Sequence, residues 1–447
     1  MAVAALAADA ARKLFLQTPL SFSSVRPRNF PHFRSFASLR PRRPNVFSPT
    51  VAAAAGGSSK STAKKKSKSI PEKVDSESLK RRTRSVKEFD EEAALRFGGT
   101  TSHIPVMLGE VLEVFTSIPL RSFVDCTLGG AGHSCSMIQA HPEMQVYVGI
   151  DVDPVAHEKG QAMINSLLHD DLGGPISNLK AYTFVKNFSN IHHVINEIDN
   201  NLLIKGVDGI MMDLGMSSMQ VNNAERGFSV LNDGPLDMRM NPKASLTAED
   251  ILNTWPEVEL GRILRDYGEE SNWYTLQNKI VKARLTGGLH STRQLVNLIQ
   301  NTSSRTRGGR QGWIKTATRV FQALRIAVND ELNTLESSLK SCFNCLGHGG
   351  RLAVISFHSL EDRIVKKTFL NIIESSSINK DDDEEERCLD SREIDGNNKE
   401  EEEGWIKQRV RGINGEILTK RPITPTEEEE KLNRRSRSAK LRVIQKF

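Results

Sequence analysis

Hydrophobic positions follow two alternating periods from about residue 100 onward. Short apolar runs of strand length end in polar or glycine-rich turns, and they are "SFVDC", "VYVGIDVD", "GVDGIMMDLG", "GGRLAVISFH" and, near the C-terminus, "KLRVIQ". Between these runs the apolar residues recur at spacings of three and four, most clearly in residues 318–346, after which Gly347 predicts a helix end. Strands that alternate with helices predict an α/β fold with a mostly parallel, doubly wound sheet.

Residues 242–316 interrupt this alternation. They contain the helix-like segments "SLTAEDILNTW", "EVELGRILRDYG" and "STRQLVNLIQ", and no convincing strand pattern. We therefore expect a helical domain at 242–316, inserted into a sheet domain whose two parts are residues 96–241 and 317–447.

The formal charge of +6 hides an uneven distribution of charge along the 447 residues. Residues 1–90 hold 19 Lys and Arg against 6 Asp and Glu, so the rest of the chain sums to −7. Residues 1–55 are basic, rich in Ser, Ala and Pro, and lack a continuous apolar segment, which predicts an organelle transit peptide, for the chloroplast first and the mitochondrion second. Residues 56–95 are expected to form a basic disordered linker.

A second unusual segment lies near the C-terminus, where residues 381–403 hold 13 acids and 3 bases. Such a segment has few apolar side chains to bury in a core, so we expect a disordered acidic insertion at 374–403. No apolar run reaches the roughly 20 residues that a membrane span needs, and no membrane partner is expected. The five scattered cysteines argue against a disulfide framework, and Cys342-x-x-Cys345 has no partner motif at zinc spacing, so we interpret it as packing and expect no metal site.

The first expected strand runs straight into a glycine turn in "FVDCTLGGAGHS". The third glycine of the dinucleotide pattern G-x-G-x-x-G is missing, and the glycines alone fit a ligand loop and a tight turn equally well. Asp151 changes this balance because it ends the second expected strand, 22 residues after Gly129. An acid at that place in a βαβ unit accepts hydrogen bonds from the ribose hydroxyls of an adenosine ligand.

Two later strands also end in residues able to do chemistry. Asp213 ends "GIMMD", and we expect it near Asp151 because ligands lie outside the carboxyl ends of the strands, although it could also cap the next segment. His358 follows "ISF" and could orient a substrate or satisfy a buried hydrogen bond, while Ser359 is a candidate cap for the helix "LEDRIVKKTFL". No phosphate-loop lysine is present, so an adenosine ligand without pyrophosphate fits, and S-adenosylmethionine is such a ligand.

Several long motifs resemble those of the bacterial small-subunit ribosomal RNA methyltransferases that methylate the exocyclic N4 amine of a cytidine. The resemblance runs from residue 103 to residue 443 and includes "DCTLGGAGHS", "GIDVDP", "AERGFS", "DGPLDMRMNP", "ATRVFQALRIAVNDEL" and "SFHSLEDR". It implies a Rossmann-like methyltransferase sheet, S-adenosylmethionine as cofactor, and small-subunit ribosomal RNA or the small ribosomal subunit as partner. It also implies cofactor contacts at Ala131, Gly132, His133, Asp151, Phe188, Asp213 and Gln220.

The chain departs from the family pattern at two places. Met219 replaces the usual proline before Gln220, and Lys315-Thr316 replaces the usual His-Pro before "ATRVFQALR". The second change ends a basic stretch, residues 305–315, which we expect to be a loop. We predict that it binds RNA phosphates through Arg305, Arg307, Arg310 and Lys315.

Methyl transfer to the cytidine amine requires an acceptor for its N–H hydrogen bond, and the candidates are Asp213, neighbouring backbone carbonyls and His358. A carbon-5 methyltransferase would need a thiolate nucleophile, and Cys126 lies in the cofactor loop, so that class is excluded. A nicotinamide dehydrogenase conflicts with the glycine pattern. The remaining alternative is a non-catalytic, RNA-binding ribosome-assembly factor on a methyltransferase fold.

Overall fold

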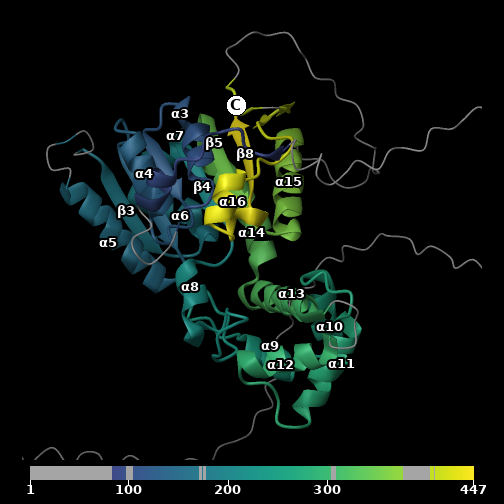
Figure 1. Cartoon of the computed structure of the whole chain (residues 1–447). Coiled ribbons are helices and arrows are strands. Elements are labelled where there is room, and N and C mark those ends of the chain that lie inside the picture. The colour runs from purple at the N-terminus through teal and green to yellow at the C-terminus, as the bar shows by residue number, and fades with distance from the viewer. Residues whose placement is uncertain are drawn as a thin grey trace, which may run out of the picture. The chain divides into compact units, whose positions relative to one another are not determined.

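The computed structural model describes residues 83–96, 104–170, 174, 178–303, 309–375, 403–406 and 408–447 (Figure 1). The expected transit peptide, most of the expected linker, and nearly all of the expected acidic insertion lie outside these residues. Arg305 and Arg307 lie outside them as well.

The described residues form an eight-stranded sheet with the order β3-β2-β1-β4-β5-β8-β7-β6. The strands are β1 (Ser122–Asp125), β2 (Val146–Asp151), β3 (Lys180–Val185), β4 (Val207–Asp213), β5 (Leu346–Ser356), β6 (Val410–Arg411), β7 (Gly415–Ile417) and β8 (Lys440–Lys446). The first five pair in parallel, whereas β8 runs antiparallel to both β5 and β7. This topology confirms the predicted doubly wound, mostly parallel sheet.

Helices cover both faces of the sheet. They are α3 (Leu108–Thr116), α4 (Gly132–Ala140), α5 (Pro154–Asp170), α6 (Ile191–Ile198), α7 (Asn200–Lys205), α14 (Glu331–Cys345) and α15 (Ser359–Glu374). Successive strand residues face opposite sides, so β1 supplies Phe123 to one core cluster and Val124 to the other. Phe115 of α3 lies in the first cluster and Leu339 of α14 in the second. Burial on both faces explains the continuous apolar runs of the central strands.

Strand β3 was not predicted because it lies at the edge of the sheet. Its residues "KAYTFV" are only half-buried, so they lack the continuous apolar run of the central strands. The short strands β6 and β7 were missed for a related reason, since two and three residues carry no periodicity.

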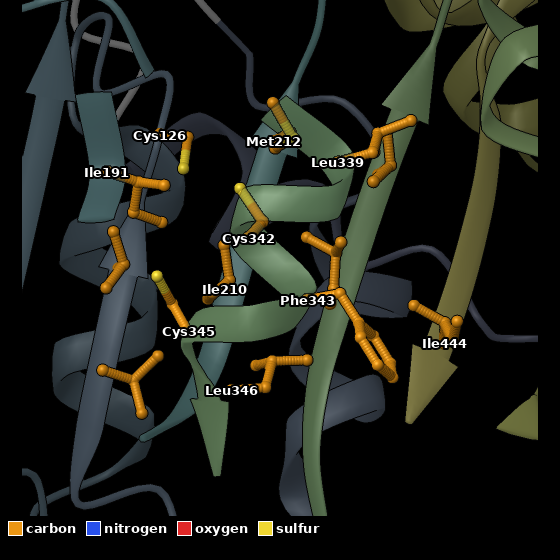
Figure 2. Packing of buried hydrophobic residues seen from close by; sticks show 14 of the residues in the cluster. Cys126, Ile191, Ile210, Met212, Leu339, Cys342, Phe343, Cys345, Leu346 and Ile444 are labelled. Atoms are coloured by element: carbon orange, nitrogen blue, oxygen red, sulfur yellow. The ribbon is translucent and has the colours of Figure 1, made fainter. Parts of the chain in front are cut away.

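The second core cluster contains the Cys342-x-x-Cys345 pair (Figure 2). Both thiols of this pair are buried among aliphatic side chains, together with Cys126 from the end of β1. Burial raises the pKa of Cys345 to about 12, which keeps that thiol protonated. The packing interpretation of this motif is confirmed.

A third core cluster belongs to the helical region. The helices that contribute to it are α9 (Ala248–Thr254), α10 (Glu257–Asp266), α11 (Trp273–Arg284), α12 (Thr292–Ser303) and α13 (Gly309–Asn329). Its buried residues run from Phe228 to Val328, so the helical core is wider than the predicted 242–316 at both ends. None of the helices in the described part of the chain is long and apolar enough to cross a membrane.

The helix expected at 318–346 is two helices, α13 and α14. They are separated by Asp330, whose φ of 47° is left-handed and cannot continue a helix. Asn329 fixes the break, since its side-chain amide donates to the carbonyl oxygen of Met238 at 2.8 Å and accepts from Met240 N at 2.7 Å. The apolar periodicity correctly predicted helix on either side of Asp330. The break depends on contacts with residues far away in the sequence, which a local pattern cannot reveal.

The folded part also begins earlier than the expected linker boundary at residue 95. Ser85 N donates to the carbonyl oxygen of Thr424 at 2.8 Å, and Arg84 pairs with Glu427 at 2.6 Å. A short helix, α2 (Glu91–Arg96), follows. The expectation of disorder up to residue 95 is therefore wrong for residues 83–95.

Candidate active site

The chain reverses its direction of travel across the sheet between β1 and β4. It leaves β1 towards β2 and β3, and it leaves β4 towards β5, although β1 and β4 are neighbours. Asp125, Asp151 and Asp213 stand at the carboxyl ends of β1, β2 and β4. The sheet therefore brings Asp151 and Asp213, the two acids predicted from the sequence, to one edge and adds Asp125. In doubly wound sheets this edge is where a ligand binds.

The glycine turn joins β1 to α4. Gly129 and Ala131 both have left-handed backbones, with φ values of 52° and 62°. Gly132 begins α4, and a Cβ there would lie 2.5 Å from Cγ of Pro105, so packing alone requires this glycine. A Cβ on Gly130 would meet nothing within 4 Å, so the loop has open space on that side. The first turn of α4 presents backbone N–H groups that suit the carboxylate of an amino-acid ligand.

Asp151 holds this loop in place. Its Oδ2 accepts a hydrogen bond from Gly129 N at 2.8 Å, and its Oδ1 accepts from Asp153 N at 2.8 Å. Burial raises the pKa of Asp151 to about 6, against the lowering effect of these two bonds. Each oxygen keeps a second lone pair, so the carboxylate can still accept the hydroxyls of a ribose diol.

Asp125 was missed as a member of this group. Its carboxylate accepts hydrogen bonds from Thr127 N at 2.9 Å and from Ser134 Oγ at 2.6 Å, and it is buried. These bonds shape the loop from within, and burial raises the pKa of Asp125. Its position at the end of "SFVD" was the available signal, the same one that identified Asp151 and Asp213.

Asp213 is the acid with unused hydrogen-bonding capacity. Its Oδ1 is buried and has no hydrogen-bond partner among the described residues, while its backbone N donates to Thr127 Oγ1 at 2.7 Å. Burial, reinforced by the nearby carboxylates of Asp125, Glu361 and Glu429, holds the pKa of Asp213 well above its ordinary value. A buried acceptor without a partner at a ligand-binding edge is suited to a donor supplied by a ligand.

His133 lies next to Asp213 but forms no salt bridge with it at neutral pH. Its Nε2 donates to the carbonyl oxygen of Val106 at 2.9 Å, which leaves Nδ1 without a proton, 3.9 Å from Asp213 Oδ2. Burial lowers the pKa of His133 to about 4, so the ring is neutral. His133 therefore shapes the site without adding charge to it.

The remaining expected cofactor contacts, Phe188 and Gln220, lie on the segments that follow β3 and β4. Phe188 begins the short 3-10 helix η1 (Phe188–Asn190) and packs against the second core cluster. Gln220 lies in α8 (Ser218–Asn222), where its Oε1 accepts from Ser217 N at 3.0 Å and its Nε2 donates to Asp153 Oδ2 at 3.0 Å. Most of the capacity of this amide is therefore used within the protein.

His358 is the N-cap of α15, so the prediction that Ser359 takes this role is wrong. Nδ1 of His358 accepts from Glu361 N at 3.4 Å, and its Nε2 lies 3.1 Å from Glu361 Oε1. Ser359 is already inside the helix, and its hydroxyl donates to Glu269 at 2.7 Å. A local structural role is therefore observed for Nδ1, whereas Nε2 has no hydrogen-bond partner among the described residues, so the substrate-orienting role of His358 stays a prediction.

Glu331, His358 and Glu361 form a cluster whose ligand-type atoms lie within 4.8 Å of one another. Arg325 already binds both oxygens of Glu331 at 2.9 Å and lies 4.0 Å from Glu361. A buried guanidinium at this position compensates the carboxylates and would repel a metal cation. The cluster therefore connects α13, α14 and α15 by charge, without a metal ion.

The predicted RNA-binding stretch can be located only in part. Lys315 is exposed on α13, and Arg310 belongs to the first turn of the same helix. The expectation of a loop over residues 305–315 is wrong from Gly309 onward, where the chain is helical.

These features describe an α/β fold whose topological switch point is suited to a nucleoside-containing ligand. Residues 100–447 match the model of the MraW methylase family. The chain is also similar to proteins named ribosomal RNA small subunit methyltransferase H: it is 42% identical over 348 residues to the one from Geobacter sulfurreducens, covering 78% of this chain and 100% of the relative. It is 39% identical over 352 residues to the one from Heliobacterium modesticaldum, covering 77% and 98%.

The chain belongs to the MraW methylase family. It is an S-adenosylmethionine-dependent methyltransferase, which confirms the expected enzyme class and cofactor and leaves the non-catalytic alternative without support. A crystal structure of a candidate rRNA methylase from Clostridium thermocellum covers 77% of this chain at 10% identity and a TM-score of 0.32.

Proposed function

We propose that this protein methylates the exocyclic N4 amine of a cytidine in the small-subunit ribosomal RNA of an organelle. The observation that carries the proposal is the buried Oδ1 of Asp213, which has no hydrogen-bond partner in the described part of the chain and lies at the switch-point edge, beside the glycine loop. The names of the bacterial relatives, which specify small-subunit ribosomal RNA, support the substrate class.

Asp151 and the glycine loop would hold the cofactor. The carboxylate of Asp151 would accept the ribose hydroxyls, and the N-terminal turn of α4 would bind the amino-acid end of the molecule. The open space beside Gly130 lets the ligand approach the backbone closely. When bound, S-adenosylmethionine supplies an electrophilic methyl group on a sulfonium.

Asp213 would position the acceptor nitrogen. The lone pair of a cytidine amine is conjugated with the ring, so the amine needs an acceptor for one N–H bond in order to direct the lone pair towards the methyl carbon. Among the described residues neither Asp213 Oδ1 nor His358 Nε2 has a hydrogen-bond partner, but Nε2 lies 3.1 Å from Glu361 Oε1, which already stands beside it. Because burial raises the pKa of Asp213, its carboxylate can also take the proton that leaves after methyl transfer.

The organelle part of the proposal rests on residues 1–55, which contain eight Lys and Arg and one acid. Their composition favours the chloroplast over the mitochondrion. A fluorescent protein carrying residues 1–60 should enter the organelle, and the same fusion with Arg40, Arg42 and Arg43 changed to Glu should not. A diffuse cytosolic signal from the unaltered fusion would contradict this part of the proposal.

The chemical part is tested by incubating the protein with isotope-labelled S-adenosylmethionine and small ribosomal subunits or their purified RNA. Label should appear in N4-methylcytidine after digestion of the RNA to nucleosides. Label in another nucleoside, or label in protein alone, would overturn the assignment of the substrate.

A further inference from the structure

Asp153, two residues after the proposed ribose acid, is a buried carboxylate whose two oxygens both accept hydrogen bonds. It is only 1% exposed. Its Oδ1 accepts from Val155 N at 3.1 Å, at the start of α5. Its Oδ2 accepts from Gln220 Nε2 at 3.0 Å and from Arg226 Nη1 at 2.8 Å. One side chain therefore joins the end of β2 to the segment that follows β4.

Arg226 extends this connection to the helical core. It ends the short helix η2 (Ala224–Arg226), and its Nη2 donates to the carbonyl oxygens of Arg239 at 2.9 Å and Met240 at 3.1 Å. Met240 N in turn donates to the side chain of Asn329 in α13 at 2.7 Å. Only the planar guanidinium group of arginine can donate to Asp153 through one terminal nitrogen and to two carbonyl oxygens through the other.

The same network reaches the cofactor site by one further hydrogen bond, from Asp153 N to Asp151 Oδ1. The two carboxylates also interact electrostatically, since the negative charge of Asp153 contributes to the raised pKa of Asp151. Arg226 carries the positive charge that compensates Asp153, with its Nη1 2.8 Å from Asp153 Oδ2.

We propose that Asp153 and Arg226 are a positioning pair that couples occupation of the ribose site at Asp151 to the placement of residues 226–240. Methyl transfer needs a cytidine amine within reach of the methyl carbon, and residues 226–240 connect the methyltransferase sheet to the helical core. A link from the ribose acid to this segment ensures that the segment is ordered when the cofactor is bound. The inference rests on the proposed function because it assigns Asp151 to the cofactor ribose and the segment to the RNA.

The first test needs no RNA substrate. Hydrogen exchange of the wild-type protein is measured with and without S-adenosylhomocysteine, the demethylated product, which carries the same ribose. We expect slower exchange both in the glycine loop, residues 127–133, and in residues 226–240. Protection confined to the glycine loop would overturn the coupling, whatever RNA the enzyme methylates.

The second test uses the variant Arg226→Lys, which keeps the positive charge but lacks the guanidinium group that joins Asp153 to the two carbonyl oxygens. The matched control is Arg284→Lys, because the guanidinium of Arg284 also donates to two carbonyl oxygens, those of Leu252 and Trp255, but both of these partners belong to the helical region. In Arg226→Lys we expect the glycine loop to remain protected by S-adenosylhomocysteine and residues 226–240 to lose their protection. Arg284→Lys should keep both effects.

Kinetics separate positioning from a merely structural role. In Arg226→Lys, kcat for RNA methylation should fall about tenfold to a hundredfold, while KM for S-adenosylmethionine changes less than about threefold. If Arg226→Lys unfolds more readily but keeps the wild-type kcat and protection pattern, the Asp153–Arg226 ion pair only stabilises the fold, and the positioning role is excluded. If the wild-type protein methylates no small-subunit RNA but shows the coupled protection, the proposed function fails and the coupling stands.

Discussion

Gly129 N donates a hydrogen bond to Asp151 Oδ2 across 2.8 Å, although Gly129 lies in the loop after β1 and Asp151 ends β2. Asp151 and the glycine loop are therefore one structural unit before any ligand binds. A substitution at Asp151 would remove a support of the loop as well as the proposed ribose contact.

Replacing Asp151 with Ala should weaken binding of S-adenosylmethionine by roughly 1.5–3 kcal/mol, the cost of losing hydrogen bonds to a charged group. Titration calorimetry measures this difference. The control is Asp208→Ala. Asp208 accepts hydrogen bonds from Ser122 N and Oγ at 2.8 Å, at the amino-terminal end of β4 and β1 and so at the opposite edge of the sheet. That variant should keep its cofactor affinity, and equal affinity in a folded Asp151→Ala variant would exclude Asp151 as the ribose acid.

Cofactor affinity should depend on pH through the same carboxyl. Because the pKa of Asp151 is raised from 3.8 to about 6, its contribution to folding stability is present below the lower value and is lost as the pH rises through the higher one. Ribose binding favours the ionised form, so affinity for S-adenosylhomocysteine should rise from about pH 5 to about pH 7, through the pKa of about 6, and then level off. A flat profile over this range, measured by calorimetry, would show that Asp151 does not titrate there.

Two glycines of the loop should respond differently to alanine. Gly130→Ala should leave the melting temperature unchanged, because the new Cβ meets no atom within 4 Å, and should weaken cofactor binding if the ligand occupies that space. Gly132→Ala should lower the melting temperature, because its Cβ would lie 2.5 Å from Pro105. Thermal unfolding and calorimetry on both variants separate packing from ligand approach, and unchanged affinity in Gly130→Ala would place the ligand elsewhere.

Asp213→Asn should keep the fold and lower kcat for methylation by about 10²-fold, because the amide retains an acceptor but cannot take a proton. The melting temperature should not fall, since the substitution removes a buried carboxyl whose raised pKa reflects an unfavourable charge. Single-turnover methylation of RNA at saturating cofactor measures the chemical step. Wild-type rates in this variant would remove Asp213 from the reaction.

The basic stretch should contribute to RNA affinity through released counterions. Changing Arg305, Arg307, Arg310 and Lys315 together to Ser should weaken RNA binding and flatten its dependence on salt, with S-adenosylhomocysteine affinity as the unchanged control. Filter binding at several salt concentrations gives both quantities. If affinity and slope stay the same, the RNA contact is better sought at Arg434 and Arg437, which are exposed on the C-terminal segment.

The sequence predicted the parts of this molecule that depend on local pattern. Apolar runs ending in Asp151 and Asp213 identified two strands and, through the logic of parallel sheets, the edge where these acids meet. The edge strand β3 was missed because a half-buried strand lacks a strong pattern. The helix break at Asp330 was missed because its cause lies in Met238 and Met240, far away in sequence.

The candidate site shows the same division. The glycine loop and Asp151 could be recognised from spacing, whereas the bonds that occupy Gln220 could not, because they come from Ser217 and Asp153. Arg226 lies in the motif "AERGFS", and the sequence pattern assigns it no role. Its partners, Asp153 and two backbone carbonyls, become visible only when the chain is folded.

The most direct test of the account is a map of cytidine methylation in organelle small-subunit RNA, with and without this protein. We predict one position that carries N4-methylcytidine in the wild type and unmodified cytidine in its absence. Reintroducing the wild-type chain should restore the modification, and reintroducing Asp213→Asn should not restore it fully. Methylation that persists without the protein, or that Asp213→Asn restores as well as the wild type, would contradict the account.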